Sequence, residues 1–302
     1  MKHEFNIQGV RWVKITEPTE KEINELNQEF PLHPLVLKEL LIPTIRPKVD
    51  MYETYFYMVL HVPVFDEKER KTNPKEIDFI LLQNAIITIS YETVRPLEEF
   101  AKIADHSIKS ASGENETAYF LYSMMRHLFS FSLRELDHIQ ENINTLEDIM
   151  FYGKNEEIVH DMYIARRDII DFRRTIQPQE EMFQSLEEKG ALLYGEGARP
   201  FLRNLTGQYY RICDILDGHK ETILELYETN ESIVTNRLNR TMKFFTVLAF
   251  LTFIPSLIAN VFGMNVAYIP LSEHPNAFWI IISGSIAATL TVFLYFKIRK
   301  IL

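Results

Sequence analysis

A stripe of polar side chains follows one face of an otherwise apolar segment near the C-terminal end of the chain. Steps of three and four residues join Asn, Thr and Ser side chains, whereas the other faces of residues 244–262 are mostly Leu, Ile, Val and Phe. The stripe comprises Asn239, Met242, Thr246, Ala249, Phe253, Ser256, Asn260 and Gly263. Amides and hydroxyls are costly in lipid, so they turn towards protein or a water-filled cavity. Such a stripe can hydrogen-bond water or a hydrated solute.

Two interpretations of the stripe stay open at this point. Its polar groups can bond a neighbouring helix, which is a common use of Ser and Thr. The two asparagines weaken that interpretation, because each amide has about four hydrogen-bonding sites to satisfy. If the stripe lines a pore, several subunits must each donate this helix around an axis, since two helices per chain cannot enclose one.

The last sixty residues or so have the hydropathy of a membrane hairpin. Residues 244–272 contain no Asp, Glu, Lys or Arg, and two apolar runs occupy residues 244–262 and 277–296. The length of each run is close to the about 20 residues that a helix needs to cross a bilayer. Residues 263–276 lie between them and contain Gly263, Pro270 and Pro275. We predict two transmembrane helices joined by an extracellular loop; the alternative is a pair of buried core helices.

Flanking charge predicts the orientation of this hairpin. Basic residues precede the first run and follow the second, namely Arg237, Arg240, Lys243, Lys297, Arg299 and Lys300. The loop has none, so both ends are expected in the cytoplasm of a plasma (inner) membrane. The N-terminus has no run of signal-peptide type, which places residues 1–243 in the cytoplasm. Residues 244–302 carry a net charge of +2, from Lys297, Arg299 and Lys300 against Glu273. Of the total of −10, residues 1–243 therefore carry −12.

The part expected in the cytoplasm contains two regions with different sequence patterns. Residues 1–115 mix strand and helix patterns, and we predict a small α/β domain. Strands are expected at 11–16, 55–61, 77–82 and 85–90, helices at 20–30 and 34–41, and a charged loop at 66–75. Residues 116–243 show helical spacing, with helices expected at 119–150 and 156–176, the latter ended or kinked by Pro178. Gly190, Gly195 and Gly197 mark an expected loop.

A heptad-like seam connects this cytoplasmic part to the first apolar run. No proline occurs between Pro200 and Pro255, and apolar positions recur at steps of three and four. We predict one helix over 201–262, a stalk that continues into the membrane; the alternative is two helices broken near Gly218. The predicted fold is thus an α+β membrane protein with an N-terminal cytoplasmic α/β domain, a long helical stalk and two C-terminal transmembrane helices.

Gly263-Met264-Asn265 follows the first apolar run directly. In that position it resembles the Gly-Met-Asn signature of the CorA-type magnesium/cobalt transporter family. The segments HPLVLKEL, RPKVDMYETYFY and MYIARRDIIDFRRTIQPQEEMFQSL, and the basic tail KIRK, are similar to further patterns of that family. The resemblance spans most of the chain.

The resemblance implies a homopentameric funnel whose first membrane helices line a channel for hydrated divalent cations. Asn265 is then expected at the outer mouth, with Asn260, Ser256, Phe253, Met242 and Asn239 along the pore. A ring of amide and carbonyl oxygens can bond the water shell of Mg²⁺, which loses that shell reluctantly. The tail residues Lys297, Arg299 and Lys300 form a basic cytoplasmic collar.

The resemblance also implies closure of the pore by intracellular Mg²⁺. We consider Asp214, Asp217, Glu221 and Asp78 as regulatory ligands, with Glu225, Glu228, Asp66 and Glu67 as further acids in the same regions. The loop departs from the family pattern, because Ile269-Pro270-Leu271-Ser272 lacks the expected acid, and Glu273 is a possible replacement. Mg²⁺ is expected as both cargo and regulator, with no organic cofactor.

Several classes of function are disfavoured by what the sequence contains. It has an acid excess, which argues against nucleic-acid binding. It has no phosphate-binding Gly-rich loop and no catalytic constellation, so no enzyme is expected. One free cysteine, Cys213, allows no disulfide framework. The alternatives kept are a Zn²⁺ transporter of the same superfamily and a membrane-tethered sensor or scaffold; the expected partners are further copies of the chain and the bilayer.

Overall fold

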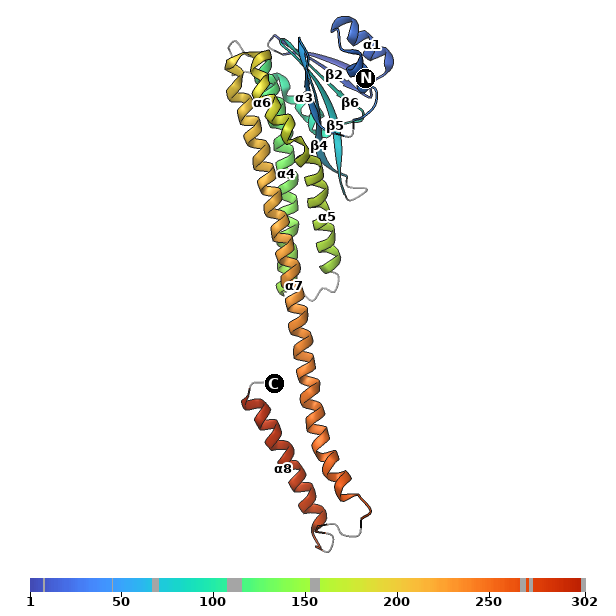
Figure 1. Cartoon of the computed structure of the whole chain (residues 1–302), viewed down its shortest axis with the longest axis vertical. Coiled ribbons are helices and arrows are strands. Elements are labelled where there is room, and N and C mark those ends of the chain that lie inside the picture. Colours follow the sequence, from blue (N-terminus) through green and yellow to red (C-terminus); the bar gives the residue numbers. More distant parts are fainter. Residues whose placement is uncertain are drawn as a thin grey trace. The chain divides into compact units, whose positions relative to one another are not determined.

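The computed structural model describes residues 1–7, 9–44, 46–66, 71–107, 116–152, 158–266, 270–271 and 274–299. The chain divides into two compact units, Met1–Leu226 and Tyr227–Leu302 (Figure 1). The first unit contains the sheet and most of the helices. The second contains the C-terminal part of one very long helix and a shorter helix that follows it.

A six-stranded mixed sheet is the centre of the first unit. Its strands lie in the order β1-β2-β6-β5-β4-β3. The strands are β1 (Lys2–Ile7), β2 (Val10–Thr16), β3 (Lys48–Met51), β4 (Tyr55–Asp66), β5 (Lys71–Leu82) and β6 (Ala85–Ser90). Only β2 and β6 pair in parallel; the other neighbours are antiparallel. Strands β2, β4, β5 and β6 are buried along most of their length, so helices cover both faces of the sheet.

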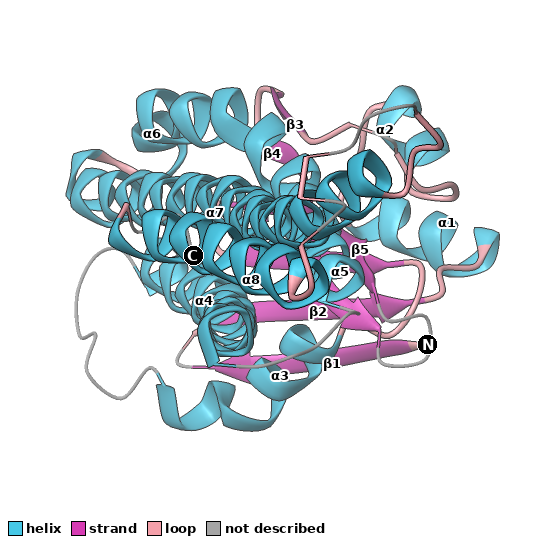
Figure 2. Ribbon diagram, turned by 90° about the horizontal axis from the view of Figure 1, so that it is seen from below, coloured by secondary structure: helices cyan, strands magenta, loops and turns pink. Residues whose placement is uncertain are grey.

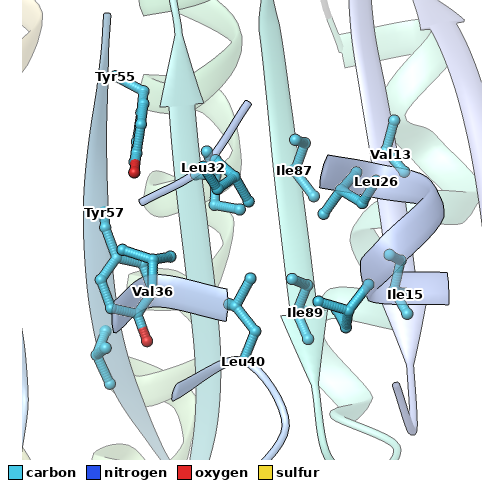
Figure 3. Packing of buried hydrophobic residues seen from close by; sticks show 13 residues of the cluster. Val13, Ile15, Leu26, Leu32, Val36, Leu40, Tyr55, Tyr57, Ile87 and Ile89 are labelled. Carbon is cyan, nitrogen blue, oxygen red and sulfur yellow. The ribbon is translucent and has the colours of Figure 1, made fainter. Parts of the chain in front are cut away.

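One face of the sheet is covered by two short helices. Helix α1 (Glu20–Glu29) begins at a capping box formed by Thr19 and Glu22, and α2 (Pro34–Glu39) has its proline in the first turn. Figure 3 shows Leu26, Leu32, Val36 and Leu40 lying over the sheet side chains. The sheet side of this cluster contains Val13, Ile15, Tyr55, Tyr57, Ile87 and Ile89, which are the alternate residues of their strands.

The residues between them point to the opposite face, which longer helices cover. Trp12 is fully buried there, with its ring 5.7 Å from both Phe100 and Phe120 and its indole N–H donated to Thr88. Phe100 belongs to α3 (Arg95–Ser107) and Phe120 to α4 (Glu116–Tyr152), so both helices are fixed to β2 (Figure 2). Burial of this aromatic cluster contributes to the attachment of α3 and α4 to the sheet.

Helices α5 (Ile158–Ile176) and α6 (Glu180–Tyr194) complete this layer, separated by a 3₁₀ turn at Pro178. Gln179 within the turn is 1% exposed, and its side chain bonds both the N–H and the carbonyl of His61 on β4. That pair of bonds fixes the α5–α6 corner on the sheet. Gly190 of α6 lies against Leu202, because a Cβ placed there would approach Leu202 Cδ1 to 2.4 Å.

Helix α7 (Arg199–Phe262) runs for 64 residues and belongs to both units. Within the first unit its buried face contains Leu202, Leu205, Tyr209, Ile212, Leu216 and Ile223. Helix α8 (Ala277–Ile298) returns beside the C-terminal part of α7 within the second unit (Figure 1). In the described part of the chain these are two helices long and apolar enough to cross a membrane, and at most 6% of their apolar windows is buried.

Most of the predicted elements are confirmed, and the exceptions have physical reasons. The helix expected at 201–262 is continuous through Gly218, and the two apolar helices are not buried in a core. The predicted loop at 66–75 is wrong for Asp66, which ends β4, and for residues 71–75, where β5 has already begun, because pairing between β4 and β5 outweighs the polar sequence. Residues 67–70 of that loop lie outside the described residues. Gly190 was expected in a loop, but it lies inside α6. Strands β1 and β3 and helices α3 and α6 had not been predicted.

Replacement of Trp12 by Ala is expected to destabilise the first unit by about 3–5 kcal/mol, because a fully buried aromatic side chain and its cavity are involved. Thermal melting of the detergent-solubilised full chain measures this. Tyr163→Ala is the control, since Tyr163 is 57% exposed. Equal melting temperatures for the two variants would contradict the proposed role of the Trp12 cluster.

Candidate pore-lining surface

The polar stripe predicted from the sequence is an exposed face of α7. Met242 and Phe253 are 60% and 58% exposed, and every other member from Asn239 to Gly263 is exposed as well. Within the described residues, no other part of the chain covers this face. The stripe thus occupies a surface that the isolated chain leaves open.

The opposite face of the same segment is the one withdrawn from solvent. Between residues 241 and 263 the positions that are not exposed are Val247, Leu251, Ile254, Pro255, Ile258 and Phe262. At roughly 100° per residue, their mean direction is about 180° from that of the stripe. Helix α8 contacts this side, since Pro255 lines a hollow with Ile282 and Ile286. The Phe250 ring, at the border between the two faces, lies 5.8 Å from the Phe296 ring of α8. The hairpin therefore packs with its polar face outward.

Hydroxyls and amides on the stripe differ in how they are satisfied. Thr246 Oγ1 donates to the Met242 carbonyl at 2.8 Å, and Ser256 Oγ donates to the Thr252 carbonyl at 2.9 Å. Their protons are used within the helix, and their oxygens stay available as acceptors. The side chains of Asn239, Asn260 and Asn265 make no hydrogen bond to any described residue. In a membrane these amides need water, an ion's hydration shell or another chain.

The C-terminal end of α7 closes on Gly263. Its N–H donates to the Ala259 carbonyl at 2.9 Å, and an added Cβ would meet that same oxygen at 3.0 Å. Glycine therefore allows the last turn to close tightly, and Met264 and Asn265 follow it as exposed residues. Ile269, Ser272 and Glu273 lie outside the described residues, and so does the proposed substitution of Glu273 for the missing loop acid.

Basic side chains flank both apolar helices, as the sequence indicated. Arg237, Arg240 and Lys243 are exposed on α7 before the first apolar run. Lys297 and Arg299 are exposed at the end of α8, with the Arg299 guanidinium 5.9 Å from the centre of the Tyr295 ring. Lys300 lies outside the described residues.

The acids considered as regulatory ligands lie in two different environments. Asp214, Asp217 and Glu221 are exposed on α7, and Asp217 pairs with Arg173 of α5 at 2.9 Å. Asp78 is fully buried in β5, away from the α7 group. Among the described residues, no three His, Cys, Asp or Glu side chains converge as a metal site. Glu67 lies outside the described residues.

Asp78 belongs to a buried cluster that the sequence analysis did not assemble. Tyr57 and Tyr91 both donate their hydroxyls to Asp78 Oδ2, at 3.2 and 2.8 Å. Burial, and then the nearby charge of Glu76, raises the pKa of the Asp78 carboxyl well above its usual value. Asp78 is also enclosed, whereas the α7 carboxylates are exposed and can meet a cation from solution. The signal was an aspartate inside the apolar run IDFILL.

Glu76 is the charged member of this cluster. Its Oε1 accepts bonds from the N–H and hydroxyl of Thr44, each at 2.7 Å, and its Oε2 is 3.3 Å from His61 Nε2. Burial alone raises the pKa of Glu76, but the bonds from His61 and Thr44 lower it overall. The pKa values of these two neighbouring carboxyls are therefore shifted in opposite directions, that of Glu76 downward and that of Asp78 upward.

Two apolar helices of spanning length at the C-terminus and a separate unit built around a mixed sheet are the architecture of a membrane-attached protein. The family model for the CorA-like Mg2+ transporter protein matches residues 7–299, and the chain belongs to that family. Membership in a transporter family agrees with the expectation that the chain is not an enzyme.

Relatives with both magnesium and zinc in their names match over most of the chain. The cobalt/magnesium transport protein CorA of Thermotoga maritima is 25% identical over 295 residues, covering 96% of this chain and 82% of its own. The zinc transport protein ZntB of Yersinia pseudotuberculosis is 21% identical, covering 93% and 85%. The complete structure of the CorA magnesium transporter from Methanocaldococcus jannaschii matches with a TM-score of 0.80 at 18% identity, covering 96% and 90%. That likeness confirms the fold.

Replacement of Asp78 by Asn is expected to change how stability depends on pH. In the wild type the folded chain holds a proton that the unfolded chain releases, so stability falls as pH rises from the unfolded pKa, about 3.9, towards the raised folded pKa. Asn mimics the neutral carboxyl and removes this loss. The variant should melt at a higher temperature than wild type at about pH 8, with a smaller difference at about pH 4.

The control for this experiment is Asp50→Asn, because the Asp50 carboxylate is on a partly exposed strand where it pairs with Lys48. Melting curves of the full chain across the pH range measure both variants. An Asp78→Asn difference from wild type that does not change with pH would show that Asp78 is ionised in the fold.

Proposed function

We propose that the chain is a passive, channel-like uptake system for hydrated divalent cations, most of all Mg²⁺, with Co²⁺ and Ni²⁺ as further cargo. Five copies would each donate the stripe of α7 to one central pore, with α8 outside. The observation that carries this proposal is the exposed polar face of α7, which points away from the side where Pro255 meets α8. The amides of Asn239 and Asn260 on this helix make no bond to any residue that the structure describes, so in a membrane they need a partner from elsewhere.

The membrane potential can drive a divalent cation inward. A divalent cation entering a compartment that is negative by 100 mV gains about 4.6 kcal/mol, twice the single-charge value of about 2.3. No further energy source is required. The termini are proposed to be cytoplasmic, since the basic residues flank both ends of the hairpin. The membrane is then the plasma (inner) membrane.

Position along α7 assigns roles to the stripe. Asn265 and the turn of Gly263 and Met264 form the outer mouth, where amide and carbonyl oxygens bond the water shell of the ion. Asn260, Ser256 and Asn239 form polar rings further along. Phe253 and Met242 form apolar constrictions, which can stop conduction by excluding water. A basic ring at the cytoplasmic end of the pore is formed by Lys297, Arg299 and Lys300.

Mg²⁺ is proposed as its own inhibitor. The exposed acids Asp214, Asp217 and Glu221 repel their counterparts on neighbouring copies, and bound Mg²⁺ would relieve that repulsion and hold the copies together. The Arg173 pair neutralises part of Asp217 within each chain. Asp214 and Glu221 are therefore the stronger candidates.

A Zn²⁺ transporter of the same family is the second candidate, because a zinc transport protein is among the relatives. Ion flux into proteoliposomes distinguishes the two: Zn²⁺ entry with Mg²⁺ entry no greater than in protein-free vesicles would favour zinc. Absence of flux for every divalent ion would favour a membrane-tethered sensor or scaffold.

Asn265→Ala is expected to reduce Mg²⁺ flux at least about tenfold while the oligomer still assembles, since a pore-mouth amide that bonds the ion's water shell is worth roughly 1.4 kcal/mol or more. Flux is followed with a Mg²⁺ indicator trapped in proteoliposomes, and assembly by mass in detergent. Asn276→Ala is the matched control, because Asn276 is exposed and its side chain makes no capping bond. Wild-type flux in Asn265→Ala refutes the assigned role.

Mg²⁺ at millimolar concentration is expected to slow trypsin cleavage of the cytoplasmic part, since bound ions hold neighbouring copies together. The double variant Asp214→Asn/Glu221→Gln should lose this protection. Its matched control is Glu25→Gln/Glu188→Gln, which removes two exposed carboxylates elsewhere. Protection that persists in the first variant would count against regulation through the α7 acids.

A further inference from the structure

A hollow lies on the first turns of α7, around Gly207. It has a volume of about 630 Å³ and is lined by Glu196, Arg199, Pro200, Arg203, Asn204, Gly207, Gln208 and Arg211. A Cβ built on Gly207 would meet nothing within 4 Å. Glycine is a poor residue for a helix interior, where Ala would be favoured. The missing side chain opens the floor of a hollow of the size that small ligands occupy.

Three guanidinium groups border this hollow. Arg203 and Arg211 are each four residues from Gly207, so they lie on the same ridge of the helix on either side of it. Neither has a carboxylate partner among the described residues. Arg199 is one turn before Arg203 and donates two hydrogen bonds of 2.8 Å to Glu196. That pair satisfies the only acid lining the hollow, which leaves an excess of two positive charges.

The amides at the same place add donors. Asn204 Oδ1 accepts bonds from Gln208 Nε2 at 2.5 Å and from the Tyr122 hydroxyl at 3.2 Å. The carbonyl oxygen of Asn204 is thus occupied, whereas its amide N–H groups make no bond to any described residue. A ligand that only accepts hydrogen bonds suits this arrangement.

The position of the arginines along the helix points to the same ligand. The N-terminal end of a helix carries partial positive charge, so acids are favoured there and bases are disfavoured. The first turn of α7 contains no acid and begins with Arg199. Local repulsion among these groups is relieved by a bound anion.

We propose that the hollow around Gly207 binds a phosphate-class anion from solution, with linked phosphates preferred over a single one. Arg203 and Arg211 are about 12 Å apart along the helix axis, so a short polyphosphate chain can bridge them better than one phosphate group can. Arginine forks suit phosphate oxygens, to which they donate two parallel hydrogen bonds. The site is independent of ion conduction and lies within the first unit.

Isothermal titration of the full chain in detergent with inorganic tripolyphosphate, at about 0.15 M salt, tests the proposal. Wild type should bind saturably, and inorganic phosphate should bind more weakly. The double variant Arg203→Gln/Arg211→Gln should bind at least about tenfold more weakly for each lost guanidinium. The control Lys102→Gln/Lys220→Gln removes the same charge from exposed positions elsewhere and should bind as wild type does.

Gly207→Leu separates a built hollow from general positive charge. It keeps every arginine and favours helix over the wild-type glycine, but its side chain fills the floor of the hollow. It should abolish tripolyphosphate binding while far-UV circular dichroism and melting stay unchanged. Binding equal to wild type in Gly207→Leu or in the arginine variant, or no saturable binding in wild type, overturns the proposal. So does binding only to vesicles that contain phosphatidylinositol phosphates, which would make a lipid headgroup the source of the phosphate.

Discussion

Hydrocarbon offers no hydrogen-bond partner, and this constraint governs how the hairpin can be used. The asparagines of α7 have no bond to any described residue, and α8 covers the face of α7 that is already apolar. A single chain therefore leaves costly groups open in the membrane. They can be satisfied by water held between several copies, so conduction and assembly become one requirement. The hydroxyls of Thr246 and Ser256 need outside partners less than the amides do, because each already donates its proton to a carbonyl of its own helix.

The same helix α7 also belongs to the first unit, where it packs on other helices. Its buried face packs with α4 and α6, and those helices are fixed to the sheet by Trp12 and by Gln179. Its exposed face changes sign along its length, from Arg199, Arg203 and Arg211 to the acids after Cys213. Copies of the chain arranged around an axis would bring like charges near one another, both in the basic part and in the acidic part of this face. Divalent cations at the acidic part and phosphate anions at the basic part are physically matched counter-charges.

Acidic residues in this chain serve two unlike purposes. Those on α7 remain exposed and charged, where they can respond to cations. Asp78 is enclosed by Tyr57, Tyr91 and Glu76, and burial raises the pKa of its carboxyl. Net charge by itself does not separate these groups, because a buried carboxyl contributes to stability through its proton and not through a cation. Burial decides which acids are available for regulation.

The sequence by itself determined the elements whose signals are local and repeated. The lack of charged residues identified both apolar helices. Apolar and polar positions at steps of three and four identified the stripe and predicted that α7 continues through Gly218. It did not reveal β1, β3 and α3, or Gly190 inside α6, because these depend on partners that lie far apart in the chain. Only the tertiary structure decided that Asp78 is buried beside Glu76 and that α8 contacts α7 opposite the stripe. Periodicity defines the faces of a helix, but packing decides which face is covered.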